Sequence, residues 1–255
     1  MKKINVGIAG GAGYTGGELL RILMHHPEVH ISFVHSTSNA GKSVIEVHTD
    51  LVGDTDLVFT NTFSNSIDVL FLCVGHHEAK KILEEQKIAA SVSIIDLSQD
   101  FRLIANAVIA DRTFVYGLPE LNREKVTTAK NIANPGCFAT AIQLALLPLA
   151  KSGLLQDIYT TGITGSTGAG QSLSATAHFS WRANNIQAYK TLDHQHVFEI
   201  VQSLNQLQAD APLSTSGEGP GLHFVPWRGD FTRGIYTSSV IDCSLPLEAV
   251  QEMYA

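Results

Sequence analysis

A lone cysteine follows a turn and precedes a long apolar run in "NPGCFATAIQLALLPLA", residues 134–150. Pro135 and Gly136 suit a turn and the apolar run suits a helix, so we expect Cys137 in the first helical turn. Unpaired backbone N–H groups and the positive end of the helix dipole stabilise a thiolate at such a position. Cys137 is therefore a candidate nucleophile, and a small buried side chain and a metal ligand are the alternatives.

The other two cysteines suit packing rather than chemistry. Cys73 lies in the apolar "LFLCV" and Cys243 in "VIDCSL", and both segments are typical of strands. The three cysteines are far apart and no CxxC pair exists, which predicts a reduced, cytoplasmic protein.

The charge and the apolar pattern of the chain argue against nucleic acids and membranes as partners. The net charge is −7 and no basic run occurs, which argues against a nucleic-acid partner. No apolar run approaches the ~20 residues of a membrane span. Hydrophobic residues make up 44% of the 255 residues, enough for a sizeable core. We expect a globular protein that acts on a small molecule.

The segment "GIAGGAGYTGGEL" places three glycines, Gly10, Gly13 and Gly16, between a strand pattern and a helix pattern. Glycines there let the backbone approach a pyrophosphate, whose charge is stabilised by the helix N-terminus. The loop predicts dinucleotide binding by the glycines with Tyr14 and Thr15 between them, although a tight turn alone would also need glycine.

The end of the second strand pattern indicates which dinucleotide. An NAD site usually has an acidic residue there to hold the ribose 2′-hydroxyl. Here the segment reads "HSTSNAGK", and no acid lies between Glu28 and Glu46. Ser36, Ser38 and Lys42 could instead hold a 2′-phosphate, with Thr37 nearby, so NADP is the predicted cofactor. An ordinary polar loop is the alternative.

Two patterns divide the chain. Strand and helix signals alternate in the first half, which predicts an α/β, Rossmann-like, doubly wound parallel sheet. The second half reads as an α+β domain with strands of antiparallel character. The expected boundary lies just before Cys137, giving a cofactor domain at 1–136 and a catalytic and dimerisation domain at 137–255. The expected strands are 4–10, 30–36, 67–74, 92–98, 157–165 and 233–245, and the expected helices are 13–26, 77–87, 138–149 and 194–207.

Several motifs together resemble one family. The chain contains "GIAGGAGYTGGELLRIL", "AGK", "YGLPELNRE", "NPGCFATA", "GSTGAGQ", "AYKTLDHQHVFEI" and "GDFTRGI". This set resembles the N-acetyl-gamma-glutamyl-phosphate reductase family of arginine biosynthesis over nearly the whole chain. The resemblance implies that Cys137 forms a thioester with the gamma-acyl group and expels phosphate, and that NADPH then delivers a hydride to give the semialdehyde.

The resemblance carries two further expectations. It implies a homo-oligomer, dimer or tetramer. Members of the family also normally continue for several tens of residues beyond the equivalent of Ala255, with a tail that helps to form the cofactor site. The chain is therefore expected to lack that tail.

"HQH" at 194–196 opens an expected helix and could cluster with Glu199. The resemblance makes this segment the source of the acid/base. We expect His194 in that role, with an ordinary pKa of about 6.5, and His196 and Glu199 orienting or binding the substrate. His196 as the acid/base is the alternative within the motif. Helix capping with solvated imidazoles is the alternative. Zinc is not expected, because "HxH" supplies two ligands and no third is identifiable.

Three further residues are candidates for binding the substrate. "GSTGAGQ" follows a strand, and its backbone amides could form a nest for an anion, with Ser166 as a contact. Arg102 in "DFR" and Arg233 in "TRG" could hold a carboxylate or a phosphate, since guanidinium suits bidentate anion recognition. A flexible connection and surface ion pairs are the alternatives.

Two other functions compete with the reductase. A semialdehyde dehydrogenase of the aspartate or aminoadipate type would share the glycine loop and the cysteine but lack "AYKxxxHQHxxEI". A non-catalytic NADP-binding paralogue would not need Cys137 at a helix start.

Overall fold

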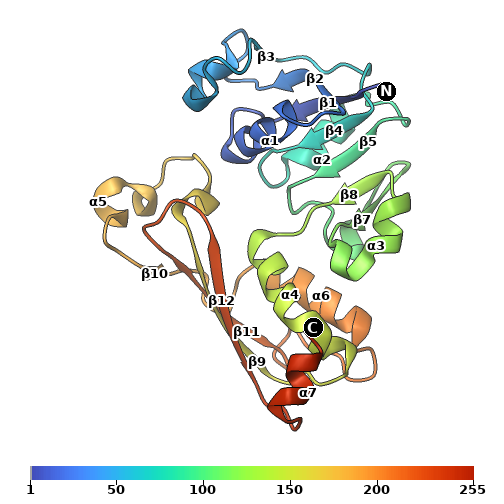
Figure 1. Cartoon of the computed structure of the whole chain (residues 1–255), viewed down its shortest axis with the longest axis vertical. Coiled ribbons are helices and arrows are strands. Elements are labelled where there is room, and N and C mark those ends of the chain that lie inside the picture. The colour runs from blue at the N-terminus through green and yellow to red at the C-terminus, as the bar shows by residue number, and fades with distance from the viewer. Residues whose placement is uncertain (1) are drawn as a thin grey trace. The chain divides into compact units, whose positions relative to one another are not determined.

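The computed structural model describes residues 2–255. The chain forms two compact units, of which the first ends at Asn134 and the second begins at Pro135 (Figure 1). Both residues belong to the turn that precedes Cys137.

The first unit is built on an eight-stranded sheet with the order β3-β2-β1-β4-β5-β8-β7-β6. Its pairs are parallel except for β6, which pairs antiparallel with β7 at the edge. The strands are β1 (Ile4–Ala9), β2 (Val29–His35), β3 (Phe59–Thr60), β4 (Val69–Leu72), β5 (Ser93–Asp96), β6 (Val108–Ile109), β7 (Arg112–Tyr116) and β8 (Asn131–Ala133).

Both faces of this sheet are covered, as alternating side chains require. On β1, Val6 and Ile8 enter a core with Leu20 of helix α1, whereas Ala9 enters a second core with Ala79 of helix α2. The helices are α1 (Tyr14–Met24), α2 (Glu78–Glu85) and α3 (Pro119–Thr128), and the short 3₁₀ turns are η1 (Val44–Glu46), η2 (Thr49–Leu51) and η3 (Ile104–Asn106). This arrangement confirms the predicted doubly wound α/β architecture.

The second unit contains a four-stranded mixed sheet with the order β10-β11-β9-β12. Strand β9 runs parallel to β11 and antiparallel to β12. The strands are β9 (Ile158–Thr164), β10 (Gln187–Ala188), β11 (Leu222–Arg228) and β12 (Ile235–Ile241).

Helices α4 and α6 lie against one face of this sheet (Figure 1). The helices are α4 (Cys137–Lys151), α5 (Phe179–Arg182), α6 (His196–Leu207) and α7 (Leu247–Glu252), and the 3₁₀ turns are η4 (Ser166–Ala169) and η5 (Ala175–Ala177). A sheet with helices on one face is the predicted α+β unit.

Candidate active site

The first unit has its topological switch point between β1 and β4. From β1 the chain proceeds through β2 and β3 on one side, and from β4 it proceeds to the other side. Ligands of open α/β sheets bind outside the carboxyl ends of the strands at such a point. Gly10 follows β1 and Cys73 follows β4, so the glycine loop lies at this position.

The glycines of the loop are required by close packing. Gly10 has φ +75°, and a Cβ on it would lie 2.4 Å from the carbonyl oxygen of Cys73. A Cβ on Gly16 would lie 2.6 Å from the Cα of Gly11. Gly13 caps α1, whose first turn contains no acidic side chain, and the next residues, Tyr14 and Thr15, are exposed. The loop and the start of α1 therefore fit a dinucleotide phosphate.

His48 holds the glycine loop by a hydrogen bond to its backbone, a role that was not predicted from the sequence. Its buried ring donates from Nε2 to the carbonyl oxygen of Gly11, at 2.8 Å. A Cβ on Gly17 would lie 2.6 Å from the same ring, so glycine there lets α1 approach it. Asp50, two residues further along the chain, accepts two hydrogen bonds from Arg21 of α1, at 2.6 and 2.7 Å. No short motif marks His48, because its partner is 37 residues away.

The residues predicted to hold a 2′-phosphate lie together after β2. The Lys42 ammonium donates to the side-chain oxygen of Asn39 at 3.3 Å, and the Asn39 amide donates to Ser38 at 3.2 Å and to Ser36 at 3.5 Å. Ser38 and Lys42 are exposed and Ser36 is buried. The cluster offers hydroxyl donors and a cation, which is the donor set that an anion needs.

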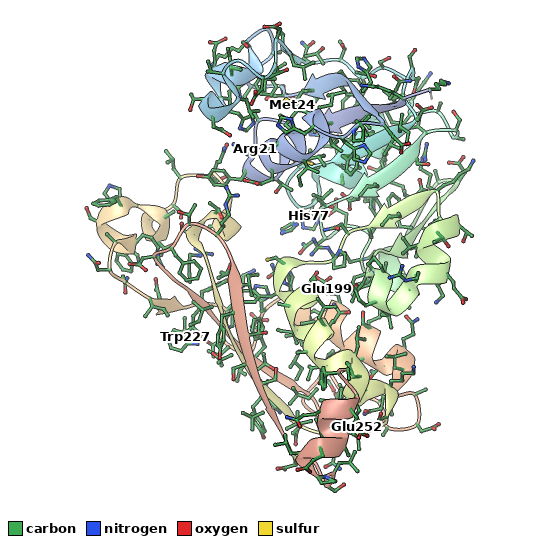
Figure 2. The ribbon with its side chains drawn as sticks, in the orientation of Figure 1. Arg21, Met24, His77, Glu199, Trp227 and Glu252 are labelled. Carbon is green, nitrogen blue, oxygen red and sulfur yellow. The ribbon has the colours of Figure 1, made fainter. Side chains whose placement is uncertain are left out.

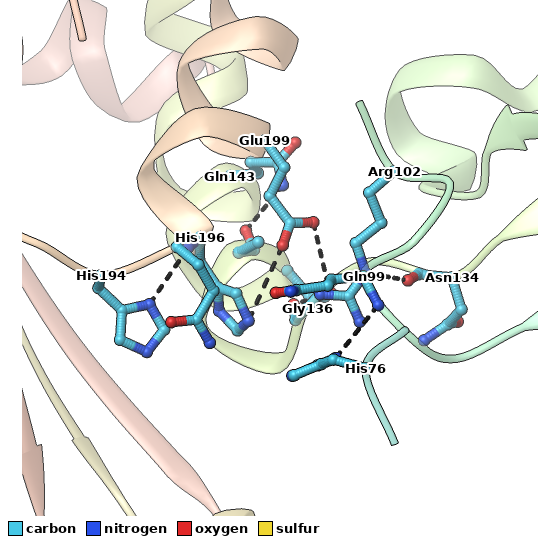
Figure 3. A network of polar contacts seen from close by, with 12 residues as sticks. His76, Gln99, Arg102, Asn134, Gly136, Gln143, His194, His196 and Glu199 are labelled. Atoms are coloured by element: carbon cyan, nitrogen blue, oxygen red, sulfur yellow. Dashed lines mark hydrogen bonds and ion pairs between the residues drawn. The ribbon is translucent and has the colours of Figure 1, made fainter. Parts of the chain in front are cut away.

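Arg102 lies beyond the carboxyl end of β5 and is buried. Its Nε donates to the carbonyl oxygen of Asn134 at 2.9 Å (Figure 3). Its Nη2 donates to the carbonyl oxygen of Leu97 at 2.9 Å. Arg102 thus fixes the chain three residues before Cys137.

Asp96, at the end of β5, is also buried and was not singled out from the sequence. Burial raises the pKa of its carboxyl to about 6, although the N–H and O–H of Ser98 both donate to it.

In the second unit, Cys137 is the first residue of α4, as predicted. Gly136 caps the helix with extended φ/ψ, and the first turn contains no acidic side chain. Cys137 is exposed, whereas Phe138 and Ala139 after it are buried. The thiol therefore lies at the positive end of a 15-residue helix and is accessible to a ligand.

Glu199 and His196 of α6 surround the residue before the cysteine. The Gly136 amide donates to Oε2 of Glu199 at 3.1 Å, and Oε1 of Glu199 lies 3.8 Å from Nε2 of His196 (Figure 3). Both side chains are buried. A Cβ on Gly136 would lie 2.4 Å from His196 Nε2 and 2.6 Å from Glu199 Oε1, so only glycine fits there.

His194 precedes α6 and is enclosed by aromatic rings. It makes edge contacts with Phe138, Tyr189 and Phe224, with ring centroids 5.8, 5.8 and 5.5 Å away. Its Nδ1 accepts from the backbone N–H of His196 at 3.2 Å, which places the proton of the neutral ring on Nε2.

Burial is the main cause that lowers the pKa of His194, to about 4, and the charge of Lys190 adds to the shift. The expectation of an ordinary value was therefore wrong, because the ring is not solvated but buried among apolar groups. At neutral pH His194 is a neutral hydrogen-bond donor through Nε2.

The structure argues against the predicted anion nest at "GSTGAGQ", because five of its seven backbone amides already donate to carbonyl oxygens of the chain. The N–H groups of Ser166 and Thr167 donate to the carbonyl oxygens of Phe231 and Thr232, and the N–H of Gly165 donates to that of Gly234. Ser166 remains partly exposed in η4. Arg233 is exposed, and a Cβ on Gly165 would lie 2.7 Å from its Cα. Ser166 and Arg233 therefore lie in two adjoining segments.

Two further residues near His194 were not predicted from the sequence. Tyr189 packs on His194, and the guanidinium carbon of Arg228 lies 4.6 Å from the centroid of the Tyr189 ring. Burial raises the pKa of the Tyr189 phenol. The charge of Arg228 and a side-chain hydrogen bond with Arg228 oppose the shift, whereas negative charge at Cys137 adds to it. Only the strand register brings Arg228 to this face, so no local motif could reveal it.

Within residues 2–255, no group of three or more histidine, cysteine, aspartate or glutamate side chains is arranged to hold a metal ion. No helix in the described part of the chain is long and apolar enough to cross a membrane.

Comparisons with known proteins match both units. The family model described as "Semialdehyde dehydrogenase, NAD binding domain" matches residues 5–129. The one described as "Semialdehyde dehydrogenase, dimerisation domain" matches residues 137–255.

Solved structures with this fold include two semialdehyde dehydrogenases. Aspartate semialdehyde dehydrogenase II from Vibrio cholerae has a TM-score of 0.70 at 18% identity, covering 99% of this chain and 78% of that one. Aspartate semialdehyde dehydrogenase with NADP from Candida albicans has a TM-score of 0.64 at 16% identity, covering 99% and 76%. At these identities the likeness is one of fold.

Curated relatives are much more similar in sequence. N-acetyl-gamma-glutamyl-phosphate reductase from Christiangramia forsetii is 53% identical over 99% of this chain and 75% of its own length. The reductases from Bacteroides thetaiotaomicron and Flavobacterium johnsoniae are each 52% identical over 98% of this chain and 75% of their length. With half of its residues identical to theirs over nearly its whole length, the chain belongs to the N-acetyl-gamma-glutamyl-phosphate reductase family.

Proposed function

We propose that the chain catalyses the NADPH-dependent reductive dephosphorylation of an N-acyl-glutamyl phosphate to the N-acyl-glutamate semialdehyde, a step of arginine biosynthesis. The observation that carries the proposal is the exposed Cys137 at the first position of α4, beside the buried pair His196 and Glu199. A reactive thiol, a dinucleotide loop and the names of the curated relatives all favour this chemistry over a binding-only role.

The first half of the reaction forms a thioester. The Cys137 thiol loses its proton, and the thiolate attacks the acyl carbon. The bond between that carbon and the phosphoryl oxygen then breaks, and phosphate leaves with the electron pair. The helix N-terminus stabilises the thiolate that starts this step.

The second half reduces the thioester. Bound NADPH supplies a hydride. As the acyl carbon receives the hydride, negative charge develops on its oxygen, and Nε2 of neutral His194 can donate a hydrogen bond to such an oxygen. When the C–S bond breaks, the thiolate of Cys137 is regenerated and the semialdehyde is released.

The polar groups of the first unit suit NADP. The glycines Gly10, Gly13 and Gly16 leave room for the pyrophosphate, and Tyr14 and Thr15 lie at the helix start that would face it. Ser36, Ser38 and Lys42 would hold the 2′-phosphate. The NADP named for the Candida albicans structure agrees with this cofactor.

We assign the remaining polar residues of the site as follows. His196 and Glu199 form the pair that exchanges the thiol proton with solvent, since an imidazole can carry a proton and the carboxylate 3.8 Å away can orient the ring. Arg102 holds the turn before Cys137. Ser166 and Arg233 contact the substrate. We also propose that the protein is cytoplasmic, a location that its three unpaired cysteines and the biosynthetic pathway support.

The open face of the second sheet supports a homo-oligomer. Tyr159, Tyr236 and Val240 are 57%, 64% and 66% exposed on neighbouring strands β9 and β12. Figure 2 shows Trp227 of β11 on the side of the sheet away from α4 and α6. Such an apolar face suits a second copy of the chain, as the family description "dimerisation domain" suggests.

A reverse assay tests the function. The chain is given N-acetylglutamate semialdehyde, inorganic phosphate and NADP, and the absorbance of NADPH is followed. We expect NADPH to form only when all three are present. Formation of NADPH without phosphate would identify a hydrolytic aldehyde dehydrogenase. If no NADPH formed with all three substrates present, the proposal would be refuted.

A further inference from the structure

Arg228 is the last residue of β11, and the alternation of the strand fixes the face it occupies. Phe224 and Pro226 are buried, whereas His223, Val225 and Trp227 are only partly so. Phe224 packs on Phe138 of α4, with ring centroids 5.0 Å apart. Because side chains two residues apart share a face, Arg228 extends from the face that carries the start of α4.

Two ring contacts connect Arg228 to His194. The guanidinium carbon lies 4.6 Å from the centroid of Tyr189, and the centroid of Tyr189 lies 5.8 Å from that of His194. Both Arg228 and Tyr189 are partly buried. Arg228 is therefore at the edge of the site, with one aromatic ring between its charge and His194.

The positive charge of Arg228 lacks an anion. No ion pair joins it to a carboxylate anywhere in residues 2–255, and its Nε is buried without a hydrogen-bond partner. A second buried arginine lies beside it, because Nη1 of Arg182 donates to the carbonyl oxygen of Arg228 at 2.7 Å. A partly buried cation with an unused donor is costly unless a ligand supplies the acceptor.

The geometry points to Arg228 as the residue that binds the α-carboxylate of the acyl-amino-acid substrate, while Cys137 attacks the other end. This inference rests on the proposed function. The substrate carries two anions. Its phosphoryl group is attached to the carbon that the thiol attacks, whereas its carboxylate lies several bonds away. The ring of Tyr189 separates Arg228 from His194, which suits the distant anion, and a guanidinium stacked on that ring presents its N–H edge to a carboxylate.

Paired substrates test this assignment. N-acetylglutamate semialdehyde carries the α-carboxylate, and acetamidobutanal is the same aldehyde without it. The ratio kcat/KM is measured for both aldehydes, with phosphate and NADP in excess, on the wild-type chain and on Arg228→Gln. Removing the charge of Arg228 should lower kcat/KM roughly 10- to 100-fold, and so should removing the carboxylate of the aldehyde. This is the usual loss for a hydrogen bond to a charged group. The kcat/KM of Arg228→Gln for acetamidobutanal, which lacks both groups, should be no lower than after either single change.

Several readouts separate this role from a structural one. The KM for inorganic phosphate and the affinity for NADP should stay within about twofold in Arg228→Gln. Arg123→Gln, at an exposed arginine of α3, is the matched control and should behave as wild type. Arg228→Lys should recover part of the preference for the aldehyde that carries the carboxylate, because lysine keeps the positive charge but cannot donate the two parallel hydrogen bonds of a guanidinium.

The inference fails if Arg228→Gln slows both aldehydes equally, or if it raises the KM for phosphate instead. If the wild-type chain turns over neither aldehyde, the proposed function fails by itself. Calorimetric titration of N-acetylglutamate and acetamidobutyrate then repeats the comparison without turnover. Equal affinities of the wild-type chain for these two probes would refute carboxylate recognition by Arg228.

Discussion

Cys137 combines exposure with the positive end of α4, a position at which a thiolate is stabilised. We expect Cys137→Ser to abolish turnover, because a serine hydroxyl is a poor nucleophile without a strong base. Binding of NADPH should not change, since the groups proposed to hold it lie in the first unit. Steady-state assays and a fluorescence titration of NADPH measure the two effects.

Cys243→Ser is the matched control for that substitution, because Cys243 is also exposed but lies after β12 rather than at a helix start. It should keep full activity. Burial raises the pKa of Cys73 to about 12, so this thiol should resist alkylation at neutral pH. Appreciable turnover by Cys137→Ser would contradict its role as the nucleophile.

His194 tests whether a neutral imidazole acts as a donor. We expect His194→Asn to lower kcat roughly 10²–10⁴-fold, the range for a positioned catalytic group. His194→Gln should retain more activity, because its amide N–H can approach the position of Nε2. The lowered pKa of about 4 means that the neutral form persists until the pH falls through that value.

The pH–rate profile of the wild-type chain should accordingly show no His194 limb between pH 5 and 8, and activity that depends on this ring should decline only near its pKa of about 4. A limb near pH 6.5 that disappears in His194→Asn would show an ordinary, proton-relaying imidazole instead. Normal turnover by both His194→Asn and His196→Asn would refute a role for the whole "HQH" segment.

At the scale of elements, the start of α4 depends on how closely α6 approaches it. A Cβ on Gly136 would lie 2.4 Å from a ring nitrogen of His196, and that ring is buried. We expect Gly136→Ala to cost about 1–3 kcal/mol of stability, the usual cost of overpacking, and to displace Cys137. Thermal unfolding and the rate of Cys137 alkylation measure both effects.

Gly75→Ala is the control, because a Cβ there would meet nothing within 4 Å. It should unfold at the wild-type temperature. If Gly136→Ala were as stable and as active as wild type, the tight junction between α4 and α6 would be unnecessary.

The loop after β2 should decide between the two dinucleotides. Lys42→Glu places a negative charge beside Asn39, where we expect the 2′-phosphate. NADPH should bind roughly 10- to 100-fold more weakly, as for the loss of a charged hydrogen bond, whereas NADH should be little affected. Lys81→Glu, the same charge change at an exposed residue of α2, should alter neither affinity. If Lys42→Glu lost equal affinity for NADPH and NADH, the assignment of this loop to the 2′-phosphate would be refuted.

The sequence predicted the elements with strong local patterns and missed those defined by partners far along the chain. Strands β1, β2, β4 and β5 and the start of α4 lie where expected. Strand β11 was missed because Pro226 interrupts "LHFVPWR" and argues against a central strand, yet β11 pairs with both β9 and β10. Strand β8, only Asn131–Ala133, is too short to show a period.

The same distinction holds for the site. Cys137 could be singled out because a turn and a helix start are local signals. The i, i+3 spacing of His196 and Glu199 is also local, but only the resemblance to the family gave these two residues a role. His48 and Arg228 contact residues that lie far away in the sequence, so no local pattern marks either of them. The pKa of His194 depends on rings from three other segments, which no local pattern encodes.

At the scale of the whole molecule, the open face of the second sheet should govern assembly. Its exposed positions form cross-strand rows, since Tyr159 pairs with Val240 and Ile163 pairs with Tyr236. Large apolar side chains exposed in this way, with the polar pair Thr161 and Ser238 between the two rows, are unfavourable in water, so a second copy should cover them. We expect the chain to sediment as a dimer or tetramer, and Val240→Lys should shift it to a smaller species. Ile22→Lys, at an exposed apolar residue of α1, should leave the assembly unchanged. A wild-type chain that sediments as a monomer at micromolar concentration would show that this face is not an interface between copies.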